Sequence, residues 1–70
     1  MKDKVSNCIK EHRLRRGLSQ EELAQAVGVS RQSINSIERE RYIPSLPLAL
    51  RLAQFFNCPT DALFELQEKG

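Results

Sequence analysis

Apolar residues recur along this chain at intervals of three and four positions, the spacing that lines up one face of an α-helix. The first such stripe consists of Val5, Cys8, Ile9, His12 and Arg13. Turn and capping residues interrupt the pattern about every 10 to 15 residues. The pattern therefore predicts an all-α fold of five helices, at about residues 5–16, 20–27, 31–40, 46–56 and 60–64, within one domain spanning residues 1–70.

Capping residues mark the ends of these helices. Gly17 is suited to end the first helix, because glycine readily adopts the left-handed backbone conformation found after helix C-termini. Ser19 and Glu22 have the spacing of a capping box, in which each side chain accepts a hydrogen bond from the backbone N–H of the other. The N-caps expected for the last three helices are Ser30, Ser45 and Thr60.

The predicted helix at residues 31–40 has a polar face without an acidic residue. At about 100° per residue, an arc of about 140° holds Arg31, Gln32, Asn35, Ser36 and Arg39. Arginine pairs bidentately with guanine O6 and N7, and glutamine or asparagine with adenine N6 and N7. This face suits the major groove of DNA, although a merely solvated face explains this helix alone equally well.

The neighbouring helix favours the DNA interpretation. Two helices joined by a turn of about three or four residues that contains glycine form a helix-turn-helix, whose second helix reads bases. Residues 20–27, 28–30 and 31–40 fit that plan, so the unit spans about residues 20–40. Gln20 lies at a helix N-terminus, where free N–H groups favour phosphate, and Ser30 and Ser33 offer hydroxyls for the same purpose.

A charged pair is expected to join the first and third helices. Arg13 lies at the edge of the first apolar stripe, and Glu38 lies beside Ile34 and Ile37 of the third helix. An ionised group that faces a core needs a partner of opposite charge. We therefore expect an Arg13–Glu38 salt bridge with a structural role; the alternative is that both side chains extend into water.

The fourth helix is apolar nearly all round, which is more than one small core requires. One stripe consists of Leu46, Ala49, Leu50, Ala53 and Phe56, and a second of Leu48, Leu52 and Phe55. The surplus favours a self-association surface. The residues assigned to this dimer interface are Leu48, Leu52, Phe55, Phe64 and Leu66. Leu14, opposite the first stripe, has no role in this scheme.

Composition and charge indicate what kind of molecule this chain binds. Of the 70 residues, 40% are hydrophobic and 29% are charged, as in an ordinary globular chain. The net charge of +2 is unevenly placed: residues 1–19 hold six basic and two acidic residues, whereas residues 43–70 hold two basic and three acidic ones. A basic half indicates a polyanionic partner.

Other classes of function are disfavoured. The chain has one histidine, His12, and its two cysteines, Cys8 and Cys58, lack metal-ligand or redox spacing, so we expect neither a metal nor a cofactor. The cysteines fit small buried residues, and nothing in the sequence supports a bridge between them. No acid–base or nucleophile constellation indicates an enzyme. Apolar runs are too short for a membrane span and no signal peptide is visible, so we expect a cytoplasmic protein.

Several pieces of the sequence occur at the spacings of a known family. They are the run Gly17-Leu18-Ser19-Gln20-Glu21-Glu22-Leu23-Ala24, the run Val27-Gly28-Val29-Ser30-Arg31-Gln32-Ser33-Ile34, and the pairs Ile37-Glu38 and Pro44-Ser45. From about residue 7 to residue 64 the chain resembles the Cro/repressor-type, or XRE, helix-turn-helix family, and in particular its compact single-domain regulators. The resemblance implies a five-helix domain that binds operator DNA as a homodimer, usually as a repressor.

The resemblance also implies roles for individual residues. The base-reading positions match Arg31, Gln32 and Ser36, together with Asn35 and Arg39. The phosphate-contacting positions match Gln20, Ser30, Ser33, Arg41, Tyr42 and Ser45. The family's ion pair between helices 1 and 3 matches Arg13 and Glu38. Compact members sometimes add a strand before the first helix that pairs with one after the fifth, for which residues 4–6 and 65–67 are suited.

Two positions depart from the family pattern. Many members carry a large aliphatic residue or tyrosine where this chain has His12, and we expect a packed imidazole there, with a pH-dependent switch as the alternative. Many members have glycine where this chain has Glu40, so the resemblance does not predict the turn at residues 40–42.

Two functions follow from these patterns. The leading one is a sequence-specific transcriptional regulator that binds a near-palindromic operator as a dimer, with residues 31–40 in the major groove. The alternative is a protein-interaction module, such as an antitoxin or a bridge to the transcription machinery, that uses the fourth and fifth helices and binds DNA only secondarily. The polar face of residues 31–39 favours the first, because a module that reads no bases does not need it.

Overall fold

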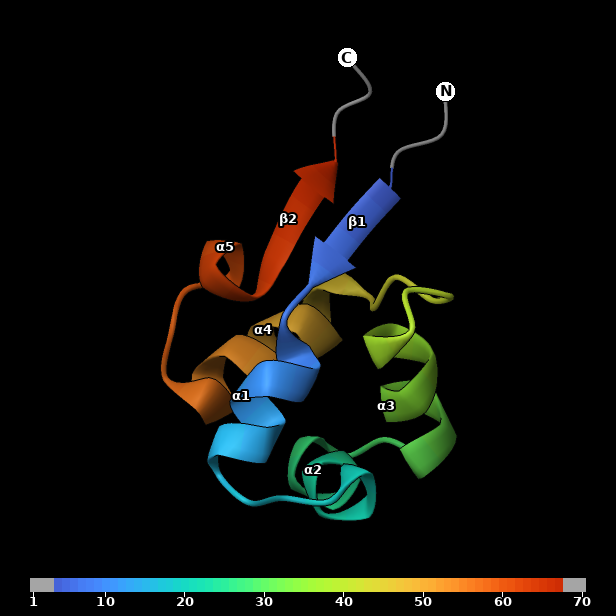
Figure 1. Cartoon of the computed structure of the whole chain (residues 1–70), viewed down its shortest axis with the longest axis vertical. Helices are drawn as coiled ribbons and strands as arrows, with labels where there is room; N and C mark the ends of the chain where they lie inside the picture. The colour runs from blue at the N-terminus through green and yellow to red at the C-terminus, as the bar shows by residue number, and fades with distance from the viewer. Residues whose placement is uncertain (1–3, 68–70) are drawn as a thin grey trace.

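The computed structural model describes residues 4–67, and over these residues two short strands flank five helices (Figure 1). The strands are β1, Lys4–Asn7, and β2, Phe64–Gln67. The helices are α1, Ile9–Arg15; α2, Gln20–Val27; α3, Arg31–Glu38; α4, Leu46–Phe56; and α5, Thr60–Leu63. None of the helices in this part of the chain combines the length and apolarity needed to cross a membrane. The predicted five-helix fold with a terminal strand pair is confirmed.

Helices α2 and α3 begin at their predicted caps. At the start of α2, Ser19 Oγ accepts a hydrogen bond from the Glu22 N–H at 3.0 Å, and Glu22 Oε1 accepts one from the Ser19 N–H at 2.8 Å. At the start of α3, Ser30 Oγ accepts from the Ser33 N–H at 3.2 Å. These bonds satisfy backbone donors that the first turn of a helix leaves free.

The last two helices differ in how they begin. Ser45 Oγ accepts from the Leu48 N–H at 3.4 Å, so Ser45 caps α4 as predicted. The predicted cap of α5 was wrong: Pro59 holds the N-cap position without a side-chain cap bond, and Thr60 is the first helical residue. Proline is compatible with this place because its fixed φ of −69° suits the extended backbone that an N-cap residue adopts.

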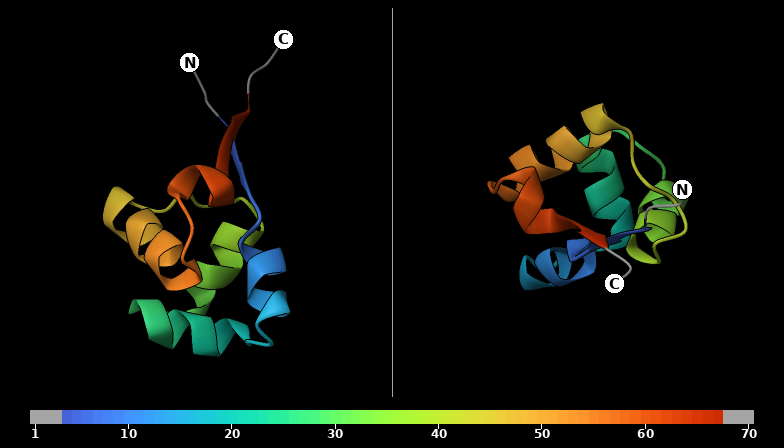
Figure 2. Two further views of the ribbon diagram at one scale, coloured as in Figure 1. Left: turned by 90° about the vertical axis from the view of Figure 1, so that its left-hand side faces the viewer. Right: turned by 90° about the horizontal axis from the view of Figure 1, so that it is seen from above.

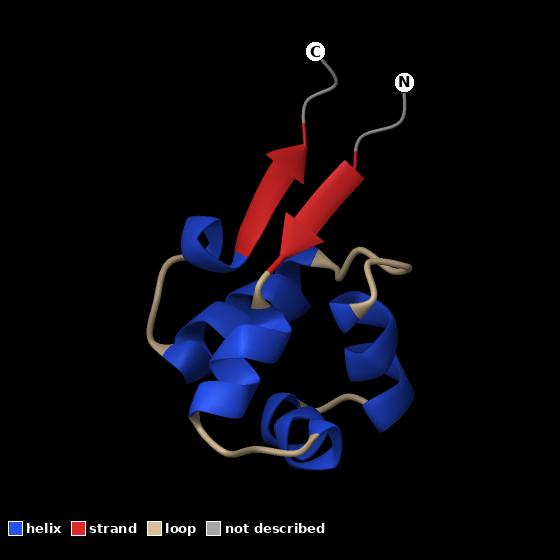
Figure 3. Ribbon diagram, viewed as in Figure 1, coloured by secondary structure: helices blue, strands red, loops and turns tan. Residues whose placement is uncertain are grey.

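Strands β1 and β2 form an antiparallel pair that projects from one end of the helices (Figure 3). Val5 lies opposite Leu66, and Asn7 lies opposite Phe64. The pairing corrects the predicted start of the first helix, because Val5 is extended and α1 begins only at Ile9. Oδ1 of Asn7 accepts a hydrogen bond from the Ile9 N–H at 3.1 Å, which supports that start. The helical spacing wrongly placed Val5 in a helix, because the strand that pairs with it, β2, lies at the other end of the described chain and leaves no local signal.

All five helices contribute to one core. Figure 2 shows α2 lying across the end of the bundle opposite the strand pair. The buried apolar residues are Ile9, Leu23, Ala24, Val27, Ile34, Ile37, Leu48, Leu52, Ala53, Phe56 and Leu63. This core holds α3 from its inner side and leaves its outer side to solvent.

Helix α4 turns parts of both stripes to the core: Leu48 and Leu52 from one, and Ala53 and Phe56 from the other. The assignment of Leu48 and Leu52 to a dimer interface was therefore wrong. Their side chains are 5% and 0% exposed, whereas Leu46 and Leu50 are 69% and 52% exposed. Because α4 is apolar nearly all round, periodicity could not tell which of its residues pack inward; the packing of α4 on α2 and α5 decides it. The other residues assigned to the interface are not fully buried: Phe55, Phe64 and Leu66.

Candidate nucleic-acid interface

A glycine turn sets the course of the chain from α2 to α3. Gly28 has a φ of 78°, a left-handed conformation that glycine adopts without strain. The N–H groups of Gly28 and Val29 both donate to the carbonyl of Ala24, which closes the end of α2. The hydroxyls of Ser30 and Ser33 then lie 3.1 Å apart at the start of α3. Two predicted phosphate-contacting hydroxyls therefore meet at one helix N-terminus.

Helix α3 packs through its isoleucines and presents its polar side outward. Ile34 and Ile37 are completely buried. The predicted base-contacting residues include three exposed ones, Arg31, Gln32 and Arg39, and two half-buried ones, Asn35 and Ser36. The helix ends at Glu38 rather than at residue 40, and Arg39 is its C-cap. Because the inner side is fixed, the outward side chains are held on a rigid element.

A shallow hollow of about 300 Å³ lies on the outward side of α3. Its lining consists of Ser30, Gln32, Ser33, Ser36 and Tyr42. Tyr42 comes from the loop that follows α3 and is exposed. The helix and the loop therefore form one continuous surface.

The loop between α3 and α4 contains a glutamate in a conformation that favours glycine. Glu40 has a φ of 61°. Its N–H donates to the carbonyl of Ile37 and the N–H of Arg41 donates to the carbonyl of Ser36, both at 2.9 Å. These two hydrogen bonds hold the turn, although the Cβ of Glu40 makes its left-handed conformation sterically unfavourable. The predicted phosphate-contacting residues of this loop are all exposed: Arg41, Tyr42 and Ser45.

The predicted ion pair between α1 and α3 is present. Arg13 Nε donates to Glu38 Oε2 at 2.7 Å, and Arg13 Nη2 donates to Oε1 at 3.2 Å. The two side chains are 9% and 4% exposed, so the pair is shielded from water. Arg13 Nη1 also donates to the carbonyl of Leu18 at 2.8 Å. The bidentate geometry fixes α3 against α1.

Gln20 extends this pair towards the outward side of α3. Its Nε2 donates to Glu38 Oε1 at 3.0 Å and to Asn35 Oδ1 at 3.2 Å. A side chain predicted to contact phosphate thus has its amide nitrogen engaged within the protein. Spacing along the chain could not indicate this contact, since Gln20 and Asn35 lie on different helices.

Two further side chains with structural roles were missed by sequence reasoning. Asn7 Nδ2 donates to the carbonyl of Ile37 at 2.8 Å and joins β1 to the end of α3. Arg16 donates to the carbonyls of Phe55 and Phe56 at 3.0 and 3.1 Å. Its guanidinium lies 5.4 and 5.3 Å from their ring centroids. Arg16 therefore caps the C-terminus of α4, where a positive charge is favoured.

His12 and Leu14 are the residues of α1 that sequence reasoning could explain least. The His12 ring packs against Phe56 with centroids 5.5 Å apart. Its Nδ1 lies 3.0 Å from the carbonyl oxygen of Cys8, and because a carbonyl only accepts, Nδ1 is the donor. The packed imidazole is therefore observed. Leu14, by contrast, is an exposed leucine to which the structure gives no evident role.

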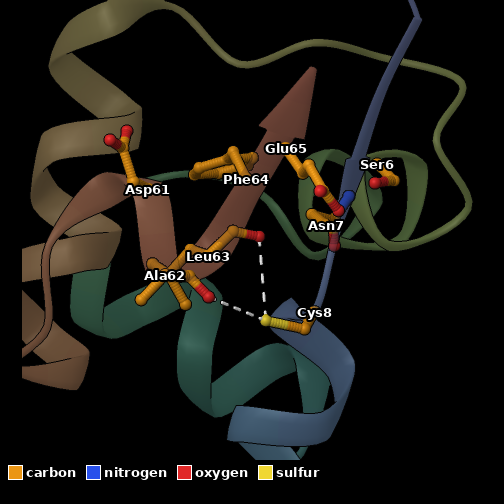
Figure 4. A pocket seen from close by; sticks show the side chains of 8 residues that line it. All are labelled: Ser6, Asn7, Cys8, Asp61, Ala62, Leu63, Phe64 and Glu65. Carbon is orange, nitrogen blue, oxygen red and sulfur yellow. Dashed lines mark hydrogen bonds between the residues drawn. The ribbon is translucent and has the colours of Figure 1, made fainter. Parts of the chain in front are cut away.

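Cys8 lines a hollow of about 350 Å³ between β1 and α5 (Figure 4). Its Sγ donates to the carbonyl of Ala62 at 3.1 Å. Burial raises the pKa of the Cys8 thiol, and the nearby Glu11 carboxylate raises it further. A thiol in this environment stays protonated and serves as a hydrogen-bond donor. Cys8 and Cys58 are both free thiols.

A second face carries exposed apolar residues around a groove of about 330 Å³. The groove is lined by Val5, Ile43, Pro44, Leu46, Ala49, Thr60, Asp61 and Phe64. Ile43 and Leu46 are exposed, and so is Leu66, which lies opposite Val5 in the strand pair. Directly opposed residues share one face of a sheet, so the apolar surface continues from the groove onto the strands.

Comparison with known proteins places this geometry in a family. The helix-turn-helix family model matches residues 9–63. An uncharacterised HTH-type transcriptional regulator of Methanothermobacter thermautotrophicus is 59% identical over 67 residues, which cover 94% of this chain and 97% of that protein.

Two solved structures share the fold. The P22 c2 repressor in complex with a synthetic operator has a TM-score of 0.73 and 30% identity, covering 76% of this chain and 80% of that one. The restriction-modification controller protein C.AhdI of Aeromonas hydrophila has a TM-score of 0.71 and 33% identity, covering 77% and 82%. The chain therefore belongs to the Cro/repressor-type helix-turn-helix family of DNA-binding transcriptional regulators, which is not a family of enzymes.

Proposed function

We propose that this protein is a repressor that binds a near-palindromic operator as a homodimer, with α3 in the major groove. The observation that carries the proposal is the outward side of α3, where guanidinium, carboxamide and hydroxyl groups are presented by a helix anchored in the core. These groups match the hydrogen-bonding edges of base pairs. The similarity to the P22 c2 repressor, whose structure holds a synthetic operator, supports it.

The contacts divide into base reading and phosphate positioning. The base-reading residues are Arg31, Gln32, Asn35, Ser36 and Arg39. Phosphates would be contacted at the start of α2 by Gln20, at the start of α3 by Ser30 and Ser33, and at the following loop by Arg41, Tyr42 and Ser45. Phosphate contacts fix the register of the protein on the duplex, and base contacts give the sequence preference.

The apolar groove fits a second copy of the chain. Ile43 and Leu46 project beside the groove that they help to line, so groove and projections lie on the same surface. A surface that carries both a groove and projecting apolar side chains can pair with its own copy about a two-fold axis, the symmetry of most homodimers. The groove begins at the loop that carries Arg41 and Tyr42, close to the DNA-facing side. A dimer through this surface would therefore present two copies of α3 to one duplex.

Selection of bound fragments from a random duplex DNA library tests the proposal. We expect a near-palindrome with half-sites about 34 Å, or one helical turn, apart. Affinity for it should fall steeply with salt, because phosphate contacts release counterions. A promoter that contains the recovered site should be silenced when the protein is present. Recovery of no motif, with weak and salt-sensitive binding only, would contradict the proposal and favour a protein-interaction module.

A further inference from the structure

We infer that Asn35 reads a guanine and that Gln20 is the positioning residue that sets this preference. The inference rests on the proposed binding of α3 in the major groove. A free carboxamide donates and accepts, and so pairs with adenine, whose N6 donates and N7 accepts. In the part of the chain that the structure describes, Asn35 Oδ1 already accepts a hydrogen bond from Gln20, whereas no such bond engages Asn35 Nδ2, so the amino group is the part left free for DNA.

Arg13 determines which groups donate and which accept in these hydrogen bonds. A guanidinium has donors only, and Arg13 donates to both side-chain oxygens of Glu38, at 2.7 and 3.2 Å. A guanidinium buried to this extent requires an ionised partner. Glu38 is therefore a carboxylate that only accepts.

This polarity fixes the orientation of the Gln20 amide. The Gln20 atom that lies 3.0 Å from Glu38 Oε1 has to donate, so it is Nε2 and not the carbonyl oxygen. The same nitrogen lies 3.2 Å from a side-chain atom of Asn35, and that atom has to accept, so it is Oδ1. The charge of Arg13 thus determines which way the Asn35 amide is turned.

The free part of the Asn35 amide is its amino group, which is a hydrogen-bond donor. Within residues 4–67, Nδ2 of Asn35 has no hydrogen-bond acceptor, and the residue is half-buried, so part of Asn35 is open to solvent. An amino group offers two hydrogens and accepts none. In the major groove guanine presents two adjacent acceptors, N7 and O6, whereas adenine places its N6 amino group beside N7. Of the two purines, guanine therefore fits the presented amino group, whereas adenine sets one amino group against another.

The first test uses modified bases in the operator recovered by selection. The base pair read by Asn35 is the one at which the Asn35→Ala variant loses its preference, and we expect a guanine there. Replacing it with 7-deazaguanine, which lacks the N7 acceptor, should weaken wild-type binding about 2- to 10-fold and leave Asn35→Ala binding unchanged. An adenine at that position whose N6 amino group is needed for binding would overturn the inference. So would an Asn35→Ala variant that keeps every base preference, while the preferences due to Arg31 and Gln32 would still support the proposed function.

The second test addresses Gln20. Gln20→Leu removes the hydrogen bond to Asn35 without adding charge, and we expect the preference for guanine over adenine to fall at that base pair alone. Gln25→Leu, on the exposed side of the same helix, is the matched control and should change no preference. If Gln20→Leu weakens all sites equally and retains the preference, Gln20 contacts phosphate only and the positioning role is wrong. Should Gln20→Leu fail to fold, the comparison of wild-type and Asn35→Ala binding to the 7-deazaguanine operator still decides whether Asn35 reads guanine.

Discussion

Single residues in left-handed conformations show how far local sequence determines local structure. Gly28 has a φ of 78°, and Asn57 has a φ of 57° at the end of α4. Both are residue types that adopt this conformation readily. Glu40, at 61°, is not, and only its place in a family pattern drew attention to it. The surrounding hydrogen bonds hold Glu40 in the left-handed conformation, at a steric cost that is absent for glycine.

We therefore predict that Glu40→Gly stabilises the fold. Removing the Cβ relieves the steric cost of the left-handed conformation, partly offset by the backbone entropy that glycine loses on folding. The free energy of unfolding should rise by up to about 1 kcal/mol, measured by urea denaturation. Glu40→Ala is the matched control, because it removes the charge and keeps the Cβ. Equal stabilisation by both variants would show that charge, not backbone strain, is responsible.

At the scale of helices and strands, the features that could be predicted from the sequence are those determined by near neighbours. The capping box needs only Ser19 and Glu22, three positions apart, and the stripe of α3 needs only its own two turns. Periodicity placed the start of α1 too early, because β1 is stabilised by pairing with β2 at the other end of the described chain, and only the family resemblance indicated that strand pair. The inward side of α4 could not be predicted either, since the helix is apolar nearly all round and its packing on α2 and α5 decides which residues are buried.

The ion pair between α1 and α3 should be essential to stability. Glu38→Gln leaves the buried Arg13 guanidinium opposite a neutral amide, and breaking a buried pair in this way costs about 3–5 kcal/mol. Urea unfolding measures the loss. Glu21→Gln, on the exposed side of α2, should change the free energy of unfolding by less than about 0.5 kcal/mol. A comparable small change for Glu38→Gln would mean that the pair is open to water.

At the scale of the whole molecule, the candidate DNA-binding surface was predictable in outline only. The outward residues of α3 follow from one helical period, so their shared side was foreseen. The engagement of Gln20 with Asn35 joins two helices, and the apolar groove joins the α3–α4 loop, α4 and the strand pair. Contacts of this kind depend on tertiary packing, which no single stretch of sequence encodes.

The proposed dimer predicts a specific effect at Leu46. Leu46→Glu places a charge beside the groove without disturbing the core, so the folded protein should become monomeric and lose affinity for the full operator. Sedimentation equilibrium measures the mass. Leu14→Glu is the matched control, because Leu14 is an exposed leucine on α1 outside the groove lining, and this variant should stay dimeric. A dimeric Leu46→Glu protein would place the interface elsewhere.

The most direct test of α3 as the base-reading helix is an affinity profile over every single-base-pair variant of the operator. Gln32→Ala should cost about 1–3 kcal/mol on the preferred sequence and flatten the profile at one base pair in each half-site. Arg41→Ala, which removes a proposed phosphate contact, should lower the affinity for all sequences about equally and preserve the profile. If instead both variants lose affinity uniformly, or the Gln32→Ala profile matches that of the wild-type chain, α3 does not read the operator as proposed.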